Sequence, residues 1–295
     1  MREMKKLYYY LIIGLLYLPA LLPLRVLYAL SDFMYFVVYR LLHYRIKVVR
    51  RNLRNAFPDR SEDEIERIEC GFYHHLCDCI VETVKLLHIS DREMMQRVEL
   101  HNTEFVEATG ADGVPIILFL GHYGNWEWVP TIAMYVAQPH TLGTLYRPLK
   151  NEVMDRVMLR IRSRFRVEHI PMRSAYRQIV QLKSTGNPFM IGFIADQRPT
   201  GGGHHNWTEF LNQDTLYNVG GETIGNRIAA RYVFLDVEKT HRGHYSMTFR
   251  EMNPKPQDGE EYPYTIEYYR LLEENIRRAP EYWLWSHNRW KRKRR

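Results

Sequence analysis

Apolar residues in the middle of the chain form short runs, and each run is followed by a stretch with helical spacing. Runs of four to eight apolar residues are typical of buried strands, and apolar positions three and four apart indicate helices. The pattern predicts strands at 114–120, 141–146, 167–170 and 189–194, and helices at 126–136, 150–163 and 173–184. Strands that alternate with helices are typical of βαβ units. We therefore expect an α/β fold with a mainly parallel sheet covered by helices.

Further elements are expected on both sides of this alternating region. Residues 232–237 and 244–251 indicate two more strands, which would pair antiparallel at an edge of the sheet, and a last helix is expected at 261–278. A long helix is expected from Glu62 to about Leu87. The segment Ser61-Glu-Asp-Glu64 before it fits a capping box with Ser61 as N-cap.

The N-terminal segment is strongly apolar. No charge occurs in the eighteen residues 7–24, and a second apolar run follows at 26–42. About 20 apolar residues are needed to cross a bilayer, but Pro19 and Pro23 would break a straight span. We expect a membrane anchor whose tyrosines lie at the membrane interface. A buried pair of core helices is the alternative interpretation. The expected division is an anchor at 1–45 and one catalytic domain at 46–295.

Composition narrows the class of function. The 295 residues carry a formal net charge of +7, and the last seven residues contain six cations. Such a basic tail suits an anionic membrane surface, an acidic protein partner or nucleic acid. The sequence contains no recognisable nucleic-acid module, so we expect no nucleic-acid partner. It also contains no phosphate-binding loop, no dinucleotide fingerprint and no metal motif with the correct spacing, so we expect neither a cofactor nor a metal. Three cysteines suggest reduced thiols.

The strongest candidate for chemistry follows the strand at 114–120, where Gly121 is succeeded by His122 and, five residues later, by Glu127. A histidine at the carboxyl end of a parallel strand lies where open α/β folds bind ligands. A carboxylate that reaches one imidazole nitrogen fixes the tautomer, so that the other nitrogen can take a proton. His122 is thus a candidate general base and Glu127 its candidate partner. The alternative is a structural histidine followed by a glutamate in the first turn of a helix.

Other strand ends should meet at the same edge of the sheet. Arg147 follows the strand at 141–146 and could hold an anion or face an oxyanion. Asp196 and Gln197 follow the strand at 189–194 and could bind acceptor hydroxyls, while Gly201–Gly203 would let a loop approach substrate. We expect Arg147, Asp196, Gln197 and also Asn125 to bind substrate. For Arg147 and for the Asp196 segment, a surface residue and an ordinary turn are the alternatives.

Four features together resemble the lipid A biosynthesis acyltransferases, which belong to the lysophospholipid acyltransferase superfamily. In order, they are the N-terminal anchor, Gly-His-x4-Glu at 121–127, Tyr-Arg-Pro at 146–148, and Asp-Gln followed by glycines at 196–203. The closing Trp-Ser-His-Asn-Arg-Trp-Lys also resembles the end of that family. The resemblance implies that His122 is the general base, Glu127 its partner, and Arg147 and Asp196 polar residues of the active site.

The resemblance also implies a reaction and its setting. The expected reaction moves a fatty acyl chain from an acyl-carrier-protein thioester to a hydroxyl of a lipid A precursor at the cytoplasmic face of a bacterial inner membrane. The basic tail and the Arg156 to Arg166 face would receive the acidic carrier protein or the anionic membrane surface. A lysophospholipid or an aminolipid is the alternative acceptor. A non-catalytic lipid-binding protein at the membrane surface is the rival from another class.

Overall fold

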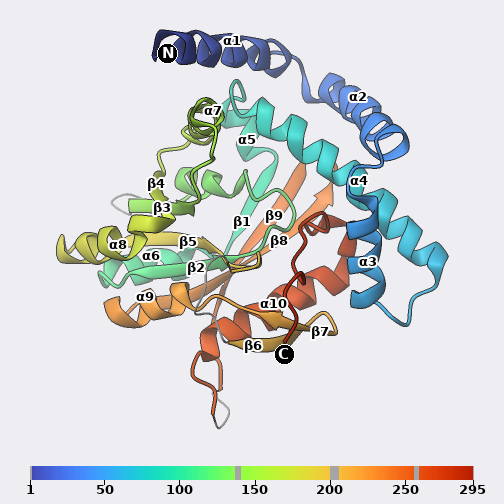
Figure 1. Cartoon of the computed structure of the whole chain (residues 1–295). Coiled ribbons are helices and arrows are strands. Elements are labelled where there is room, and N and C mark those ends of the chain that lie inside the picture. The colour runs from blue at the N-terminus through green and yellow to red at the C-terminus, as the bar shows by residue number, and fades with distance from the viewer. Residues whose placement is uncertain (1, 137–140, 200–205, 256–258, 295) are drawn as a thin grey trace.

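A central sheet organises the protein (Figure 1). In the computed structural model, which describes residues 2–136, 141–199, 206–255 and 259–294, seven strands pair in the order β1-β9-β8-β2-β5-β3-β4. A separate two-stranded hairpin is formed by β6 and β7. The strands are β1 Val98–His101, β2 Ile116–Leu120, β3 Thr141–Tyr146, β4 Glu168–Pro171, β5 Phe189–Ile194, β6 Trp207–Phe210, β7 Gln213–Leu216, β8 Arg231–His241 and β9 His244–Glu251.

The expected mainly parallel α/β sheet is confirmed. All neighbouring strands of the large sheet run parallel, except β8 and β9, which form the predicted antiparallel pair. The prediction that this pair lies at the edge is wrong, because β1 pairs with the outer side of β9 and β8 pairs with the central β2. We did not predict β1, because four residues with only two apolar positions, Val98 and Leu100, give little apolar signal. The β6–β7 hairpin escaped prediction for the same reason.

Helices surround the sheet. They are α1 Arg2–Ala20, α2 Leu24–Tyr35, α3 Ile46–Ala56, α4 Glu62–Lys85, α5 Asp91–Met95, α6 Thr103–Ala111, α7 Glu152–Arg162, α8 Ala175–Ser184, α9 Gly220–Ile228 and α10 Pro263–Arg278, with a π-helix η1 Phe36–Leu41 and 3₁₀ helices η2 Val129–Met134, η3 Met172–Ser174 and η4 Pro280–Tyr282. The predicted α4, α7, α8 and α10 are confirmed, including the Ser61 capping box of α4. The α-helix expected at 126–136 is wrong, since only the short η2 forms there.

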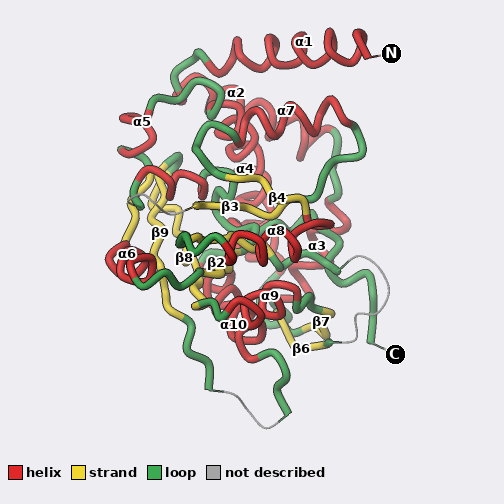
Figure 2. The backbone as a smooth tube through the Cα atoms, turned by 90° about the vertical axis from the view of Figure 1, so that its left-hand side faces the viewer, coloured by secondary structure: helices red, strands yellow, loops and turns green. Residues whose placement is uncertain are grey.

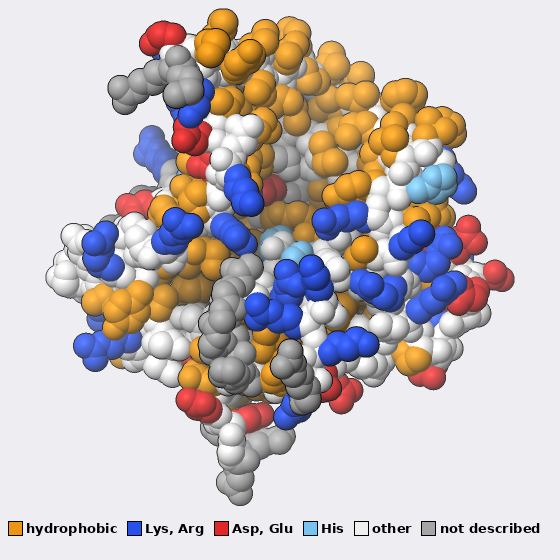
Figure 3. All heavy atoms as spheres, in the orientation of Figure 1, with side chains coloured by type: hydrophobic (Ala, Val, Ile, Leu, Met, Phe, Trp, Pro, Cys, Tyr) orange, Lys and Arg blue, Asp and Glu red, His pale blue; other side chains and the backbone are white. Residues whose placement is uncertain are grey.

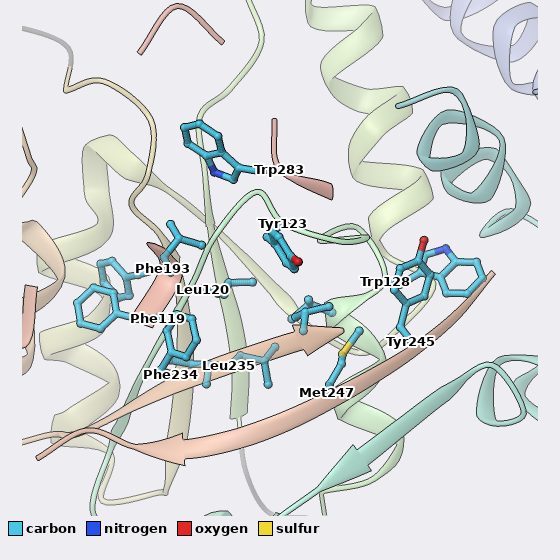
Figure 4. Close-up of a cluster of buried hydrophobic side chains, with 14 of the residues drawn as sticks. Phe119, Leu120, Tyr123, Trp128, Phe193, Phe234, Leu235, Tyr245, Met247 and Trp283 are labelled. Carbon is cyan, nitrogen blue, oxygen red and sulfur yellow. The ribbon is translucent and has the colours of Figure 1, made fainter. Parts of the chain in front are cut away.

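The two faces of β2 have different surroundings. Phe119 stacks on Tyr268 of α10 with ring centres 5.1 Å apart and lies 6.2 Å from Phe193 of β5. Figure 4 shows Phe119, Phe193 and Phe234 gathered in this part of the core. Leu118 and Leu120 alternate with Phe119 and therefore point to the opposite face, where they line a cavity. One face of the sheet is thus a packed core and the other is partly open.

The N-terminal helices lie outside this sheet. Figures 1 and 2 both place α1 along an outer edge of the molecule, beside α7. Lys5 forms an ion pair with Glu152 of α7 at 2.7 Å, and the guanidinium of Arg156 lies 4.6 Å from the ring centre of Tyr9. In the described chain, no single helix is long and apolar enough to cross a membrane. Taken together, α1 and the segment formed by α2 and η1 are long and apolar enough, but the two are bent by 111° relative to each other.

Buried charged groups attach α2 to the rest of the protein. Ser31 donates a hydrogen bond to Asp78 of α4 at 2.8 Å. Arg242, in the turn between β8 and β9, bonds both Asp78 and Asp32 of α2. Burial raises the pKa of Asp78, but Arg242 and Lys239 outweigh that effect and the pKa lies below its usual value. The carboxylate is therefore charged. Moving α2 would break its polar contacts and leave a buried charge without a partner, which is strongly destabilising.

Candidate active site

Strand register brings His122 and Asp196 together. Leu120 of β2 lies opposite Ile194 of the parallel neighbour β5. His122 and Asp196 each follow two residues later, so both leave the sheet at its carboxyl edge at the same height. The imidazole Nδ1 lies 2.6 Å from Asp196 Oδ1, and the backbone N–H of His122 donates to Asp196 Oδ2 at 2.9 Å. The two strand ends thus form one hydrogen-bonded unit.

Asp196 is buried and fully bonded. Its side chain is 2% exposed, and Trp283 Nε1 donates a third hydrogen bond to Oδ2 at 2.8 Å. Burial by itself raises the pKa of the Asp196 carboxyl, but the charge and hydrogen bonds of His122 and the bond from Trp283 outweigh it, so this pKa lies below its usual value. An ionised carboxylate only accepts hydrogen bonds. Nδ1 of His122 therefore carries a proton in both charge states, and in the neutral imidazole Nε2 carries the lone pair that can accept one.

The segment that contributes Trp283 is fixed to α3. Asn52 donates to the carbonyls of Trp285 and His287, both at 3.0 Å, and Arg45 donates to the carbonyl of Ser286 at 2.9 Å. Trp283 also forms a β-bridge with Tyr123, directly after the histidine. Our sequence analysis did not predict a role for Trp283. The cluster of aromatic residues at 283–290 was the available signal, but spacing alone does not show where such a segment docks.

Gln197 occupies the other side of the imidazole. Its Nε2 donates to His122 Nε2 at 3.2 Å, while the residue itself is exposed and lines the cavity. The predicted position of Gln197 in the site is therefore correct. A polar group that approaches Nε2 must displace this amide, which releases an N–H donor beside the imidazole.

The predicted contact between Glu127 and the imidazole is wrong. Glu127 accepts two hydrogen bonds from Arg162 of α7, from Nε to Oε2 at 2.7 Å and from Nη2 to Oε1 at 2.5 Å. Both ring nitrogens of His122 have other partners among the described residues. The spacing argument failed because residues 121–128 form a turn, with φ of +60° at Gly124, in place of the expected first turn of a helix. Glu127 still lines the same cavity as His122.

Asn125, which we expected to bind substrate, lies apart from the cavity. Asn125 is 1% exposed and does not line the cavity. Its side chain donates to Glu82 of α4 at 2.6 Å and accepts from the backbone N–H of Glu127 at 3.1 Å. Glu82 also accepts hydrogen bonds from Tyr28 and Tyr245, and burial raises its pKa. Asn125 therefore connects the turn at 121–128 to α4 and stabilises its conformation.

A cavity of about 540 Å³ opens beside the imidazole. Its floor is the open face of the sheet, and its cover comes from α7 and η2, through residues such as Met158 and Val129. The apolar side chains on the floor are Leu118, Leu120, Leu142, Met190 and Ile194. Arg147, Gln197 and Arg198 line it as well, so Arg147 lies where the sequence predicted, at the shared edge of β3 and β5. The volume and the apolar lining are typical of a site for a small organic ligand.

The predicted basic surfaces are only partly free. Of the Arg156 to Arg166 face, Arg162 binds Glu127, Arg156 covers Tyr9, and Arg164 bonds Asp91 and the carbonyl of Ile89. In the basic tail, Arg289 is 2% exposed and donates to the carbonyl of Leu216. Gly201–Gly203 lie outside the described residues. Within the described ranges, no group of three or more His, Cys, Asp or Glu side chains could hold a metal ion.

Comparisons with known proteins point to one family. The chain is 25% identical over 282 residues to a lipid A biosynthesis palmitoleoyltransferase of Escherichia coli (strain K12), and equally similar to a lipid A biosynthesis acyltransferase of Shigella flexneri. Each match covers 95% of this chain and 89% of the relative. The profile of the family described as bacterial lipid A biosynthesis acyltransferase matches residues 1–292. The chain therefore belongs to the bacterial lipid A biosynthesis acyltransferase family.

Proposed function

We propose that this enzyme transfers a fatty acyl chain from an acyl-carrier-protein thioester to a hydroxyl of a lipid A precursor. The observation that carries the proposal is the orientation of His122. Asp196 holds Nδ1, so the basic Nε2 remains at the wall of an apolar cavity of about 540 Å³. A general base beside an apolar groove is the arrangement that acyl transfer to an alcohol requires. Membership of the family supports the same reaction.

The reaction then needs no covalent enzyme intermediate. Nε2 of His122 takes the proton of the acceptor hydroxyl while the hydroxyl oxygen attacks the thioester carbonyl. The resulting tetrahedral oxyanion collapses, the C–S bond breaks, and the departing thiolate takes the proton from the imidazolium. Gln197 supports the intermediate, because its amide is freed from Nε2 when the hydroxyl binds and can donate to the oxyanion. Asp196 stabilises the imidazolium throughout.

Cations around the cavity fit acidic partners. Figure 3 shows Lys and Arg side chains around the hollow at the centre of this face. Arg147 and Arg198 line the cavity itself. Lys47 and Arg51 line a second groove on α3, together with Arg50 and Arg54, which pair with Glu69 and Glu62. An acidic carrier protein and the anionic groups of a lipid acceptor would both be attracted to such a surface. This attraction would favour delivery of both substrates to one cavity.

We also propose that α1, α2 and η1 bind the surface of the bacterial inner membrane from the cytoplasmic side. Large apolar side chains are exposed along these helices, and Figure 3 shows them as a continuous upper edge. They include Leu7, Leu11, Leu15, Leu18, Leu22, Val26, Leu30, Phe33 and Phe36. Because α1 lies flat on α7, this surface fits the plane of a bilayer interface. A lipid acceptor would then reach the cavity without leaving the membrane.

Charge substitutions on the outer side of α1 test this membrane proposal. Leu11 is 55% exposed and Leu18 is 64% exposed, so Leu11→Asp and Leu18→Asp should leave the fold intact. Each removes an apolar side chain that contributes about 1.5–3 kcal/mol when buried. Sedimentation with vesicles of phosphatidylethanolamine and phosphatidylglycerol should therefore weaken at least about tenfold for each variant.

Tyr176→Asp is the matched control, because Tyr176 is 52% exposed on α8, away from α1 in Figures 1 and 2. It should bind the same vesicles as well as the unchanged protein does. Equal loss of binding in all three variants would show that the effect is one of general charge, and it would contradict a role for α1.

The reaction itself is tested with purified protein and a carrier protein charged with a fatty acyl chain. The expected product is a lipid A precursor heavier by one acyl group in mass spectrometry, with one carrier thiol released for each transfer. Lysophospholipids and aminolipids are assayed in parallel as acceptors. Transfer to one of these alone would reassign the acceptor, and failure with every acceptor would favour a lipid-binding protein without catalysis.

A further inference from the structure

Position 192 has an unexplained glycine. Gly192 lies in the middle of β5, and the residues directly opposite it, Leu118 of β2 and Thr144 of β3, both carry side chains. Glycine weakens a strand interior, and it often marks a place where a ligand approaches the backbone. Its φ is outside the left-handed region, so the backbone does not require glycine. Something other than backbone geometry must account for the missing side chain.

Packing does not account for it either. A Cβ added at Gly192 would meet its nearest atoms, the carbonyl oxygen of Gly143 and a methyl of Leu120, at 3.7 Å, which is ordinary contact. Other buried glycines differ. A Cβ at Gly143 would lie 2.6 Å from Ile191 Cδ1, and one at Gly221 would lie 2.7 Å from Phe119. A Cβ at either of those positions would force a neighbouring side chain to move, whereas Gly192 is buried beside open space.

The open space is the cavity beside His122. Met190, Gly192 and Ile194 alternate along β5, and all three line that cavity, while Ile191 and Phe193 face the packed core. Gly192 therefore interrupts a row of apolar side chains on the cavity floor. The residues around its missing side chain, Leu120, Gly143 and Thr144, line the same cavity.

Strand register places this gap along the path of a bound chain. Gly192 lies opposite Leu118, four residues before His122, or roughly 13 Å from it at about 3.3 Å per residue. With C–C bonds of about 1.5 Å, on the order of ten carbons of an extended chain span that distance. Met190 lies one step deeper, opposite Ile116 and Leu142. A longer chain that follows β5 would pass over Gly192 and end near Met190.

We propose that Gly192 determines how long an acyl chain this enzyme accepts, with Met190 closing the deep end of the cavity. This inference rests on the proposed function, since it assumes that the acyl donor binds in the cavity. A side chain at 192 would fill the path of a long chain and leave the space near His122 unchanged. A smaller residue at 190 would extend the path.

The test compares Gly192→Ala, Gly192→Val and Met190→Ala with the unchanged protein. Carrier protein charged with an equimolar mixture of decanoyl, tetradecanoyl and hexadecanoyl chains is the donor, and products are resolved by mass spectrometry. One methylene in an apolar pocket typically changes discrimination by about tenfold or more. Gly192→Val should therefore lower the hexadecanoyl-to-decanoyl product ratio at least about tenfold, Gly192→Ala less so, and Met190→Ala should raise it. Gly192→Ala should also unfold at a higher temperature, because alanine favours a strand more than glycine does.

Ile191→Val is the matched control, since it trims a side chain on the other face of the same strand and should leave the ratio unchanged. An unchanged ratio in both Gly192 variants, with transfer retained, would overturn the proposal and leave the proposed function standing. Should Gly192→Val unfold, Gly192→Ala decides, because its one added carbon fits without movement.

Binding of the same three fatty acids is measured in parallel, by displacement of a fluorescent fatty acid from the protein. This separates the two possible failures. Wild-type protein that neither transfers nor binds any of them would overturn the proposed function and this inference together. Binding without transfer, with the length preference shifted in Gly192→Val, would support the inference and contradict the function.

Discussion

His122→Ala is expected to lower the rate of acyl transfer by about 10²–10⁴-fold, the range that a positioned general base contributes. The loss follows because Nε2, oriented through Nδ1 by Asp196, is the atom that takes the proton of the hydroxyl. The fold should survive. Asp196 keeps its hydrogen bonds from the His122 backbone and from Trp283, and the imidazole is partly exposed.

Transfer of acyl chains from the carrier thioester to the lipid A precursor measures this effect, and circular dichroism with thermal unfolding monitors the fold. A folded His122→Ala protein with nearly unchanged turnover would exclude the general-base mechanism. Gln197→Ala separates the role of the oxyanion donor from the role of the base. It should reduce turnover less than His122→Ala, because it removes a donor to the oxyanion and leaves the base.

Asp196→Asn is expected to lower kcat by about 10²–10⁴-fold and to leave KM for the thioester nearly unchanged. The amide of asparagine can donate to Nδ1, which favours the tautomer that carries its proton on Nε2. That tautomer cannot accept the proton of the hydroxyl. Because Asp196 is 2% exposed and does not line the cavity, it acts through His122, so substrate binding should be spared. A proportional rise in KM would contradict this role.

Variants of Glu127 distinguish the observed geometry from the one that the sequence predicted. If Glu127 acts through its ion pair with Arg162, then Glu127→Gln and Arg162→Gln should lower turnover similarly. The turnover of the double variant should then be no lower than that of the more damaged single variant. If Glu127 orients the imidazole as first predicted, Glu127→Gln should be far more damaging than Arg162→Gln. The same assay decides between these outcomes.

The apolar pattern predicted the parallel core of the fold well. The strands β2 and β5 are apolar runs that are buried on both faces, and such runs are visible in a single sequence. The strand β3 is only partly buried and was predicted from its place in the alternating pattern. The order of the strands was not predictable in this way, because it depends on contacts between distant segments. The edge position expected for β8 and β9 was wrong for this reason, since β1 at Val98–His101 covers β9.

The sequence analysis predicted which residues lie together, but not which acid bonds His122. His122, Asp196, Gln197 and Arg147 were all expected at one edge of the sheet, and they do lie there. The error was to pair His122 with the acid nearest in sequence. Residues five apart share a face only if the backbone between them is regular, and here a turn intervenes. Strands β2 and β5 instead bring together acid and base that are 74 residues apart.

The hydrogen bond from Trp283 to Asp196 has a consequence for folding. The sheet edge alone supplies two partners of the carboxylate, and the third arrives only when residues 283–287 have docked on Asn52 and Arg45. These contacts join segments more than 200 residues apart, and such contacts typically form late. A partly folded chain with its sheet in place would therefore hold a loosely oriented imidazole. Full turnover thus reports that the whole polypeptide has reached its native arrangement.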